Sequence, residues 1–483
     1  MKKATHSYTH KRKTTMNMGE IVPIDCIECN PGDHVRFNTS MLMRTTPLAT
    51  PAMHEVDVFT ATFFVASRNV WDEFEEFYTR GLDGLDTPTP PTIESPSMTG
   101  WAVGSLSDHL GMPSAVPNML SDAKQIRAYQ QIVNNYFLDS QLQPQISVGL
   151  GGGVDTTTSR DLQFACWSRD RFTSCRTDPQ LGTSVTIPLL GDAPIVFTEA
   201  GATPGVRTLQ RAGNSASTAL DVVQAGTGDA LITANADLAA VSAFDVEDLR
   251  EGSSFQRMKE NLNTDGARYD ERIKAGFGVP IRDSRIQIPE YLGGGFSRIQ
   301  FSEVLQTTPN EEGEGVGDLY GHGITGHKSH HVNYMAPEHG YLITVCVVRP
   351  KPEYYQGLPK QFSRPTQLDY LQPELVNLGD QPVFNREVYA AHSDPGGVHG
   401  YLPIYDEFRH QPSTIHGELR SILKDWTEVR EFSGDTALNG TFVRCNPSAR
   451  IFQTTLTDQL ICTVKHKMTC RSIVPKYPQR KLF

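Results

Sequence analysis

The stretch Tyr341–Arg349 consists almost entirely of β-branched, aromatic and other apolar residues. A Glu-His-Gly turn precedes it and Pro350 follows it. A short apolar run between such breakers predicts a strand that is buried on both faces, because a half-buried strand would alternate polar and apolar residues. A buried helix is the alternative, but the flanking Pro and Gly residues leave it little room. Both faces of this strand must then be covered by segments distant in sequence.

The segment Val56–Ala66 predicts a second strong strand, in which Phe59, Ala61, Phe63 and Val65 share one face. Further segments bounded by turn residues also have strand character. They are Glu20–Cys29, His34–Met43, Val398–Tyr405, Thr441–Arg444 and Thr455–Ile473.

Between these strands the apolar period changes to that of a helix. Asn69–Gly81 predicts a capped amphipathic helix, with Asn69 at its start, Gly81 at its end and an aromatic stripe facing the core. That stripe contains Trp71, Phe74, Phe77 and Tyr78. Further helices are predicted over Asp122–Leu138, Asp245–Leu262 and Ala267–Phe277.

Strands therefore flank a long central region of helices and loops, without the regular alternation of a parallel α/β protein. This order favours a mainly β fold, an antiparallel sandwich with very large insertions between strands. Within the insertions, Thr183–Val241 is rich in Ala, Gly and Thr, has no Lys and contains one aromatic residue. We interpret it as a surface excursion, because it has too little bulky apolar material for a large core of its own.

The composition argues against a membrane-spanning, a secreted or a disulfide-rich protein. No apolar run in the 483 residues approaches 18, so no membrane span is expected, and the polar, basic N-terminus argues against a secretory signal. The eight cysteines are too thinly spread for a disulfide framework. Cys26 and Cys29 have CxxC spacing but lack a second pair, so reduced thiols are favoured there over a metal site.

The segment 321–331 contains a dense cluster of histidines, His322, His327, His330 and His331. A metal site and a pH-sensitive contact remain open, but a plain glycine-rich loop is the favoured interpretation. No nucleophile, zinc-protease, Walker or dinucleotide motif is present. Paired carboxylates such as Glu75 and Glu76 are explained as solvated charge, so an enzyme is the weakest hypothesis, with no catalytic residue, cofactor or metal predicted.

Charge is distributed unevenly. Residues 1–19 contain five basic residues and no acid, and residues 459–483 contain six basic residues and no acid. Residues 20–458 hold 33 basic residues against 55 acidic ones. Solvated tails would explain one basic end, but two basic ends on an acidic body suggest contact with a polyanion.

Several segments together resemble the major capsid proteins of microviruses, the small tailless phages with circular single-stranded DNA, and most of all the gokushovirus branch. The resemblance covers roughly residues 17–475, and Thr183–Val241 is its weakest part. The segments that carry it are Val56-Asp-Val-Phe-Thr, Ser67-Arg-Asn-Val-Trp71, Asn134-Asn-Tyr-Phe137, Arg268-Tyr-Asp-Glu-Arg-Ile-Lys-Ala-Gly-Phe-Gly278, Pro289-Glu-Tyr-Leu-Gly-Gly-Gly295, Glu338-His-Gly340 and Asn385-Arg-Glu-Val-Tyr389.

The resemblance implies a viral jelly roll of eight antiparallel strands with long helix- and loop-containing insertions. Sixty copies would close a T=1 icosahedral shell around the genome, and residues 183–241 would form a protrusion at the threefold axis. The implied division is a basic N-terminal arm (1–19), first jelly-roll strands (20–68), insertions (69–335), remaining strands (336–475) and a basic tail (476–483).

The implied partners are other copies of the chain, the single-stranded DNA genome, a small basic DNA-binding protein, a pilot protein, an internal scaffolding protein and a host receptor. The implied location is the virion, assembled in the cytoplasm of the bacterial host. A cellular β-sandwich binding module and a carbohydrate-active enzyme are the alternatives.

Both basic ends are predicted to contact the genome from inside the shell, without reading its sequence. Tyr477 could stack on bases. The predicted contact residues are Lys2, Lys3, Lys11, Arg12, Lys13, Lys465, Lys467, Arg471, Lys476, Tyr477, Arg480 and Lys481. The alternative is that the basic residues of Thr455–Ile473 line a solvated face of the last strand.

Overall fold

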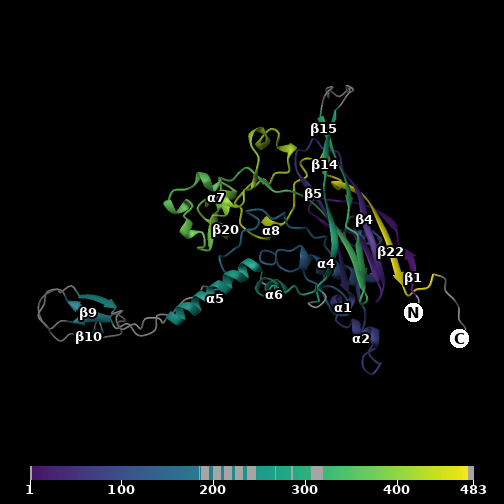
Figure 1. The fold of residues 1–483 in the computed structure, drawn as a ribbon, viewed down its shortest axis with the longest axis horizontal. Coiled ribbons are helices and arrows are strands. Elements are labelled where there is room, and N and C mark those ends of the chain that lie inside the picture. The colour runs from purple at the N-terminus through teal and green to yellow at the C-terminus, as the bar shows by residue number, and fades with distance from the viewer. Residues whose placement is uncertain are drawn as a thin grey trace. The chain divides into compact units, whose positions relative to one another are not determined.

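The computed structural model describes residues 3–183, 185, 195–199, 208–211, 220–223, 232–236, 246–266, 268–283, 287–305 and 319–476. The chain divides into two compact units. One comprises Met1–Pro179 together with Tyr269–Phe483, and the other is Gln180–Arg268. The two largest sheets of the first unit are antiparallel (Figure 1).

The four-stranded sheet of the first unit contains the long apolar run of the sequence. Its order is β13-β5-β17-β3, and every neighbouring pair is antiparallel. The strands are β3 (Ile21–Cys29), β5 (Val56–Ala66), β13 (Glu290–Arg298) and β17 (Gly340–Pro350). Nearly every residue of β5 and β17 is buried, which confirms the two strands predicted from unbroken apolar content.

Helices cover one face of the four-stranded sheet. Phe63 of β5 and Ile343 and Val345 of β17 share a core with Ile126 and Ile132 of the helix α4. The covering helices are α1 (Ser67–Val70), α3 (Leu106–Leu110) and α4 (Lys124–Tyr136). The amphipathic pattern of Asp122–Leu138 thus predicted α4 correctly.

The seven-stranded sheet covers the other face. Its order is β1-β22-β4-β15-β14, with β2 also paired to β22 and β16 to β4. The strands are β1 (Ala4–Ser7), β2 (His10–Met16), β4 (His34–Thr45), β14 (Gln300–Leu305), β15 (Leu319–Lys328), β16 (Val332–Met335) and β22 (Leu460–Ser472). Every second residue of β22 is buried, so one face of this sheet packs inward and the other is open.

The core between the two sheets is built from these alternating positions. Met43 of β4 and Val464 of β22 pack with Val58 of β5 and Val348 of β17. Two antiparallel sheets packed face to face in this way confirm the predicted mainly β sandwich of jelly-roll type. The seven-stranded sheet is wider than expected, because the basic N-terminal segment forms β1 and β2 instead of a solvated tail.

The helix predicted over Asn69–Gly81 is wrong in extent. The chain forms α1 and a separate short helix, α2 (Phe74–Thr79), because the backbone at Trp71 is extended, with φ −153° and ψ 111°. Trp71 is buried as predicted, but Phe77 and Tyr78 are 43% and 66% exposed. The aromatic spacing predicts one continuous stripe, but the break in the helix at Trp71 turns Phe77 and Tyr78 toward solvent.

The strand predicted over Thr441–Arg444 is also wrong. Thr441–Val443 lie in α8 (Gly440–Val443), a single helical turn, and Arg444 follows it with an extended backbone. The side chain of Asn439 accepts a hydrogen bond from the backbone N–H of Phe442, a helix cap that outweighs the strand preference of Thr, Phe and Val.

The remaining elements of the first unit are short. They are β6 (Pro91–Glu94), β7 (Leu120–Asp122), β8 (Gly153–Val154), α6 (Tyr269–Phe277), β18 (Glu353–Tyr354), η3 (Lys360–Phe362), η4 (Gln367–Asp369), η5 (Pro373–Leu375), β19 (Asp380–Phe384), α7 (Asn385–Val388), β20 (Val398–Pro403), η6 (Asp406–Phe408), β21 (Ser413–Thr414), η7 (Gly417–Arg420) and η8 (Lys424–Trp426). Among them, β20 confirms the strand predicted over Val398–Tyr405, and α6 confirms the helix predicted over Ala267–Phe277.

The second unit contains α5 (Val246–Asp265), which confirms the helix predicted over Asp245–Leu262. Of the predicted excursion Thr183–Val241, the described residues include four strands in two antiparallel pairs, β9 (Ile195–Glu199) with β12 (Ile232–Ala236) and β10 (Thr208–Arg211) with β11 (Leu220–Val223). The rest of that segment lies outside the described residues, and its place at a threefold axis stays a prediction. No helix in the described ranges has the length and apolar character to cross a bilayer.

Candidate nucleic-acid interface

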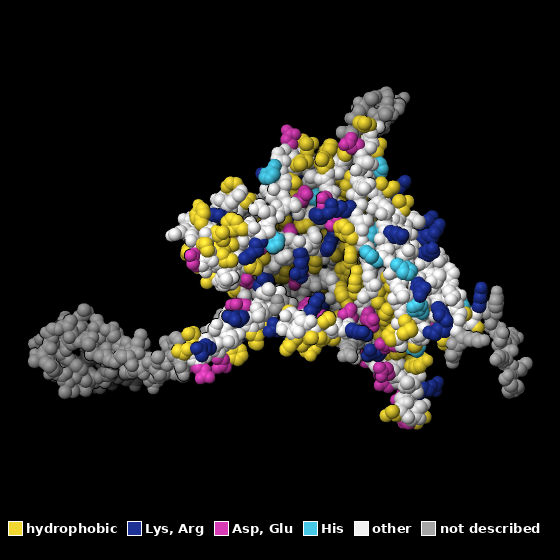
Figure 2. Space-filling view, in the orientation of Figure 1, with side chains coloured by type: hydrophobic (Ala, Val, Ile, Leu, Met, Phe, Trp, Pro, Cys, Tyr) yellow, Lys and Arg dark blue, Asp and Glu magenta, His cyan; other side chains and the backbone are white. Residues whose placement is uncertain are grey.

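The open face of the seven-stranded sheet gathers basic side chains from four strands. We call this set the cationic face. All eight members are exposed, and they are Lys11 and Lys13 of β2, Arg36 and Arg44 of β4, Lys328 of β15, and Lys465, Lys467 and Arg471 of β22. Figure 2 shows Lys and Arg gathered on the side of the molecule where Figure 1 places β4, β22 and β1.

Acidic residues are missing from the strands that build this face. The sequences of β1, β2, β4, β15, β16 and β22 contain no Asp or Glu. The edge strand β14 has one, Glu303, but it pairs with the buried Gly321 and so belongs to the opposite side of the sheet. The positive charge of the face is therefore not balanced by acids on the same strands.

The strand register aligns three lysines across the sheet. Lys11 lies directly opposite Lys465, and both Lys465 and Lys328 pair with Ser40 of β4. Adjacent strands are about 4.8 Å apart, so this row places three ammonium groups within the width of four strands. Like charges directly opposite one another destabilise a sheet, so this arrangement favours a bound anion that would offset their repulsion.

The positive charge also continues along the strands. Each outward position of β4 from His34 to Arg44 lies in a row that contains at least one cation of the face. The eight steps from Arg36 to Arg44 cover about 27 Å along the strand. The cationic face is thus a continuous track, which suits an extended polyanion better than a single small anion.

Apolar side chains interrupt the cations on the same face. Leu42 of β4 and Ile461 of β22 are about half exposed, and Ile461 pairs with Arg44. Apolar surface beside a basic track lets unpaired bases or sugars pack on it, as in proteins that bind single-stranded nucleic acid.

The structure brings five of the predicted contact residues together on this face. They are Lys11, Lys13, Lys465, Lys467 and Arg471. Arg12 turns the other way, and its guanidinium donates to the backbone carbonyls of His109 and Leu110. Lys3 donates to the carbonyl of Gly32, and Lys476 is exposed after β22. Lys2, Tyr477, Arg480 and Lys481 lie outside the described residues. Contact with DNA itself stays a prediction for all of them.

Sequence reasoning missed three members of the cationic face. Arg36, Arg44 and Lys328 come from the part of the chain in which acids outnumber bases. The signal for Arg36 and Arg44 was the alternation within His34–Thr45, where the outward positions contain no acid. Only the pairing of β4 with β22 and β15 shows that they join the basic ends.

The CxxC pair does not form a metal site with a common centre. Cys26 and Cys29 lie on β3 and belong to different apolar cores, because residues three apart on a strand point to opposite faces. All eight cysteines are free. Burial raises the pKa of the Cys26 thiol to about 12, which keeps it protonated.

The favoured interpretation of residues 321–331 as a loop is wrong, because most of them form β15. His322 is exposed on the open side, whereas His327 is buried and contacts the hydroxyls of Thr60 and Ser297 at 2.7 and 2.8 Å. The glycines fit the strand because a Cβ at Gly323 would lie 2.7 Å from a methyl carbon of Thr45. Alternation separates the histidines, and burial lowers the pKa of His327 to about 4.

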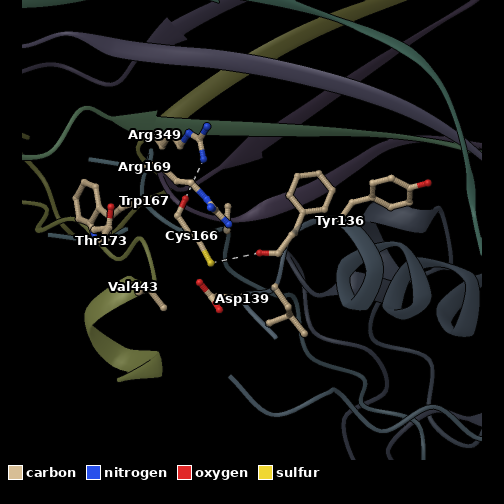
Figure 3. Close-up of a pocket in the computed structure, with 11 residues that line it drawn as sticks. Tyr136, Asp139, Cys166, Trp167, Arg169, Thr173, Arg349 and Val443 are labelled. Carbon is tan, nitrogen blue, oxygen red and sulfur yellow. Dashed lines mark hydrogen bonds between the residues drawn. The ribbon is translucent and has the colours of Figure 1, made fainter. Parts of the chain in front are cut away.

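A cavity of about 250 Å³ lies beside the end of α4 (Figure 3). Its lining includes Cys166, whose thiol donates to the carbonyl of Phe137 at 3.3 Å, and Arg349, which donates to the carbonyl of Cys166 at 2.9 Å. Burial raises the pKa of the Cys166 thiol. The cysteine is held as a protonated thiol that ties loops together, and not as an activated nucleophile.

A larger groove of about 580 Å³ contains two buried carboxylates, as a carbohydrate-active enzyme would require. Glu387 lies 2.8 Å from the guanidinium of Arg171, and Glu407 lies 3.6 Å from Lys360 and 3.7 Å from Arg364. Each carboxylate is thus compensated by cations within the fold, which is a structural arrangement.

Comparison with known proteins agrees with this architecture. A family model described as "Capsid protein (F protein)" matches residues 1–481. The chain belongs to this phage capsid protein family. It is 32% identical to capsid protein VP1 of Bdellovibrio phage phiMH2K, over 90% of this chain and 86% of that protein. It is 30% identical to capsid protein VP1 of Spiroplasma virus 4, over 85% of this chain and 81% of that protein.

A third relative extends the similarity over almost the whole chain. Capsid protein VP1 of Chlamydia phage 1 is 28% identical over 99% of this chain and 95% of that protein. The predicted resemblance to microvirus capsid proteins is confirmed. As a member of the capsid family the chain is a component of a virion, and its copies assemble into a shell.

Proposed function

We propose that sixty copies of this chain form a T=1 icosahedral shell and that the cationic face lines its interior against a circular single-stranded DNA genome. The observation that supports this proposal is the continuous, acid-free track of eight exposed cations on β2, β4, β15 and β22. The chain as a whole carries a net charge of −11, so this concentration of positive charge runs against its average.

The binding would be electrostatic and independent of base sequence. Each Lys or Arg that neutralises a phosphate releases a condensed counterion, and for single strands the logarithm of affinity falls by about 0.7 per contact for each tenfold rise in salt. Eight cations on one face therefore predict a steep salt dependence. Leu42 and Ile461 would add apolar contacts with bases or sugars.

A charge-matched pair of variants tests the genome contact. In the face variant, Lys11, Lys328 and Lys465, the transverse row, are changed to Gln. In the control, Lys274, Lys351 and Lys424, which lie outside the cationic face, are changed to Gln. Both lose three positive charges, so a difference between them reports the position of the charge and not its amount.

Purified particles of both variants are compared for DNA content and for release of DNA with increasing salt. We expect the face variant to contain less DNA and to release it at lower salt, whereas the control resembles the unaltered protein. Equal DNA content and equal salt response in the two variants would show that the cationic face does not hold the genome.

We further propose that residues 183–241 form a protrusion at the threefold axis that serves host attachment. The support is that Gln180–Arg268 forms a compact unit of its own, as an insertion between strands of a shell domain would. Replacement of 183–241 by a short Gly/Ser linker should leave shell assembly intact and reduce binding to host cells. Loss of soluble subunits would contradict the proposal, and unchanged attachment would contradict the host-binding role.

The role is structural and not catalytic in this proposal. By resemblance to microvirus capsid proteins, its further partners are a small basic DNA-binding protein, a pilot protein, an internal scaffolding protein and a host receptor, with assembly in the bacterial cytoplasm. Co-purification of each with particles, before and after DNA packaging, tests this set.

A further inference from the structure

Three polar side chains from three strands meet between the two sheets. His10 of β2 lies directly opposite His466 of β22 in the register, and their rings stack with centroids 5.0 Å apart. Asp25 of β3 approaches both from the other sheet, with one carboxylate oxygen 3.2 Å from Nε2 of His10 and the other 3.6 Å from Nδ1 of His466. One ligand atom from each residue lies within 4.8 Å of the other two.

A β-bulge brings Asp25 into this position. The pairing of β3 with β17 shifts between Thr344 and Val345, so that Ile24 is an extra residue. Ile24 packs in the core between the sheets, and its neighbour Asp25 also contacts groups between the sheets. In a regular strand these two neighbours would point to opposite faces, so the bulge re-aims the carboxylate toward the histidines.

The hydrogen bonds around His10 determine which of its nitrogens carries the proton. Nδ1 lies 2.8 Å from the backbone carbonyl of Tyr8, and a carbonyl only accepts, so Nδ1 must donate. In a neutral imidazole the lone pair is then on Nε2, which faces the Asp25 carboxylate at 3.2 Å. Two acceptors at this distance repel each other unless a cation or a proton lies between them.

His466 presents a second ring nitrogen to the same carboxylate. Its side chain is fully buried. Its Nδ1, the nitrogen that faces Asp25, also lies 3.0 Å from the hydroxyl of Thr39, and this hydroxyl would turn its hydrogen away when the lone pair of Nδ1 binds a metal. A neutral histidine that is buried beside a carboxylate is a suitable metal ligand.

We propose that His10, Asp25 and His466 bind a divalent transition-metal ion such as Zn²⁺. Two imidazole nitrogens and one carboxylate oxygen are a ligand set that zinc takes, whereas Ca²⁺ and Mg²⁺ prefer oxygen ligands. With metal–ligand bonds near 2.0–2.1 Å, ligand atoms at a tetrahedral zinc are about 3.3 Å apart. The nitrogens of His10 and His466 lie 3.2 and 3.6 Å from different oxygens of the Asp25 carboxylate, and one ligand atom from each residue lies within 4.8 Å of the other two, so a small shift of the side chains would bring three ligand atoms to this spacing.

The surroundings also suit a metal. The donation from His10 Nδ1 to the Tyr8 carbonyl is the second contact that metal-ligating histidines usually make, and it fixes the tautomer. The side chain of His10 is 36% exposed, which leaves a path to solvent and room for a water as fourth ligand. The ion would join β2 and β22 of one sheet to β3 of the other, and so fasten part of the cationic face to the shell domain.

Metal content tests the proposal directly. Tag-free particles are stripped with a chelator, incubated with Zn²⁺ at pH 7.5, dialysed and analysed for bound metal. The variant His10→Gln changes a partly exposed ligand and should fold, and His322→Gln on the open side of the same sheet is its control. We expect about one Zn²⁺ per subunit in the unaltered protein and in the control, and none in His10→Gln.

Two further measurements distinguish a metal ion from a proton bound between His10 and Asp25. Co²⁺ in place of Zn²⁺ should give the visible absorption of a four-coordinate site in the unaltered protein only, and Zn²⁺ should raise the thermal midpoint by about 2 °C or more. The proposal is overturned if the unaltered particles take up no Zn²⁺, or if His10→Gln binds as much as His322→Gln does. Stabilisation on lowering the pH toward 6, with no bound metal, would show that a proton occupies the gap instead.

Discussion

The two sheets of the first unit use the same strand geometry for different purposes. The four-stranded sheet is covered on both faces, and its central strand β17 is apolar almost throughout. The seven-stranded sheet is covered on one face, and β22 alternates buried, mostly apolar residues with exposed ones that are mostly Lys, Arg and Thr. The difference shows that a central strand covered on both faces, such as β17, serves mainly packing, whereas an open face can carry charge for a ligand without disturbing the core.

The largest effect should come from placing a charge in the covered sheet. Val345→Asp on β17 would bury an unpaired carboxylate at a position with no exposed surface, at a cost of about 4 kcal/mol or more. We expect loss of soluble subunits and of particles, measured by sedimentation of cell extracts. The matched change Thr463→Asp on the open face of β22 should leave folding intact. Normal particles from Val345→Asp would remove the distinction between the sheets.

Acid should weaken the contact between the sheets at His327. Burial lowers the pKa of this histidine to about 4, below the ordinary value near 6.5. Its contribution to stability is therefore complete above about pH 6.5 and is lost as the pH falls through 4, by about 3 kcal/mol in all. His327→Gln should have a smaller difference in thermal midpoint between pH 7.5 and 4.5 than the control His322→Gln. Equal differences would show that His327 does not couple the sheets to pH.

A smaller effect distinguishes the two sides of one strand. On β15, a Cβ at Gly323 would lie 2.7 to 3.0 Å from Thr45, Ile299 and Phe301, whereas a Cβ at Gly326 would meet nothing within 4 Å. We expect Gly323→Ala to lower the free energy of unfolding by about 1–3 kcal/mol and Gly326→Ala to leave it unchanged or slightly raised. Urea unfolding measures both. Equal destabilisation would contradict the assignment of buried and open faces.

The smallest effect concerns the repulsion between Lys11 and Lys465. Lys11→Gln should raise the stability of DNA-free protein by about 0.2–1 kcal/mol, because the two ammonium groups lie directly opposite each other. Lys13→Gln is the control, since Lys13 faces Thr463. The prediction fails if neither variant becomes more stable in urea at low salt, or if both gain the same stability. Either result would show that repulsion between Lys11 and Lys465 does not destabilise the sheet.

The sequence predicted the covered sheet better than the open one. An unbroken apolar run identifies a strand such as Val56–Ala66 by itself, so both central strands were found with nearly correct ends. The basic ends gave five members of the cationic face, but Arg36, Arg44 and Lys328 join it only through pairing between strands remote in sequence. The glycines of β15 suggested a loop because their role, close packing against β14 and β4, depends on neighbours that the local sequence does not show.

The errors in the helices have a local origin. The aromatic spacing after Asn69 fits a helical period, but the extended backbone at Trp71 interrupts it. At residues 441–444, a single capping side chain, that of Asn439, decided the conformation of four residues with strand preference. Short segments are decided by single contacts of this kind, while long periodic ones such as α4 are not.

The pairing of β4 with β22 also determines when the seven-stranded sheet can form during synthesis. Thr45 of β4 lies opposite Leu460 of β22, so β4 lacks this neighbour until more than 400 further residues have been made. At about 5–20 residues per second, a nascent chain exposes the edges of β2 and β4 for roughly 20–80 s. Unpaired edges of this kind are sites of aggregation. Among the described strands, β22 is the last to leave the ribosome, and it is the strand that joins β2 to β4 and so completes the sheet.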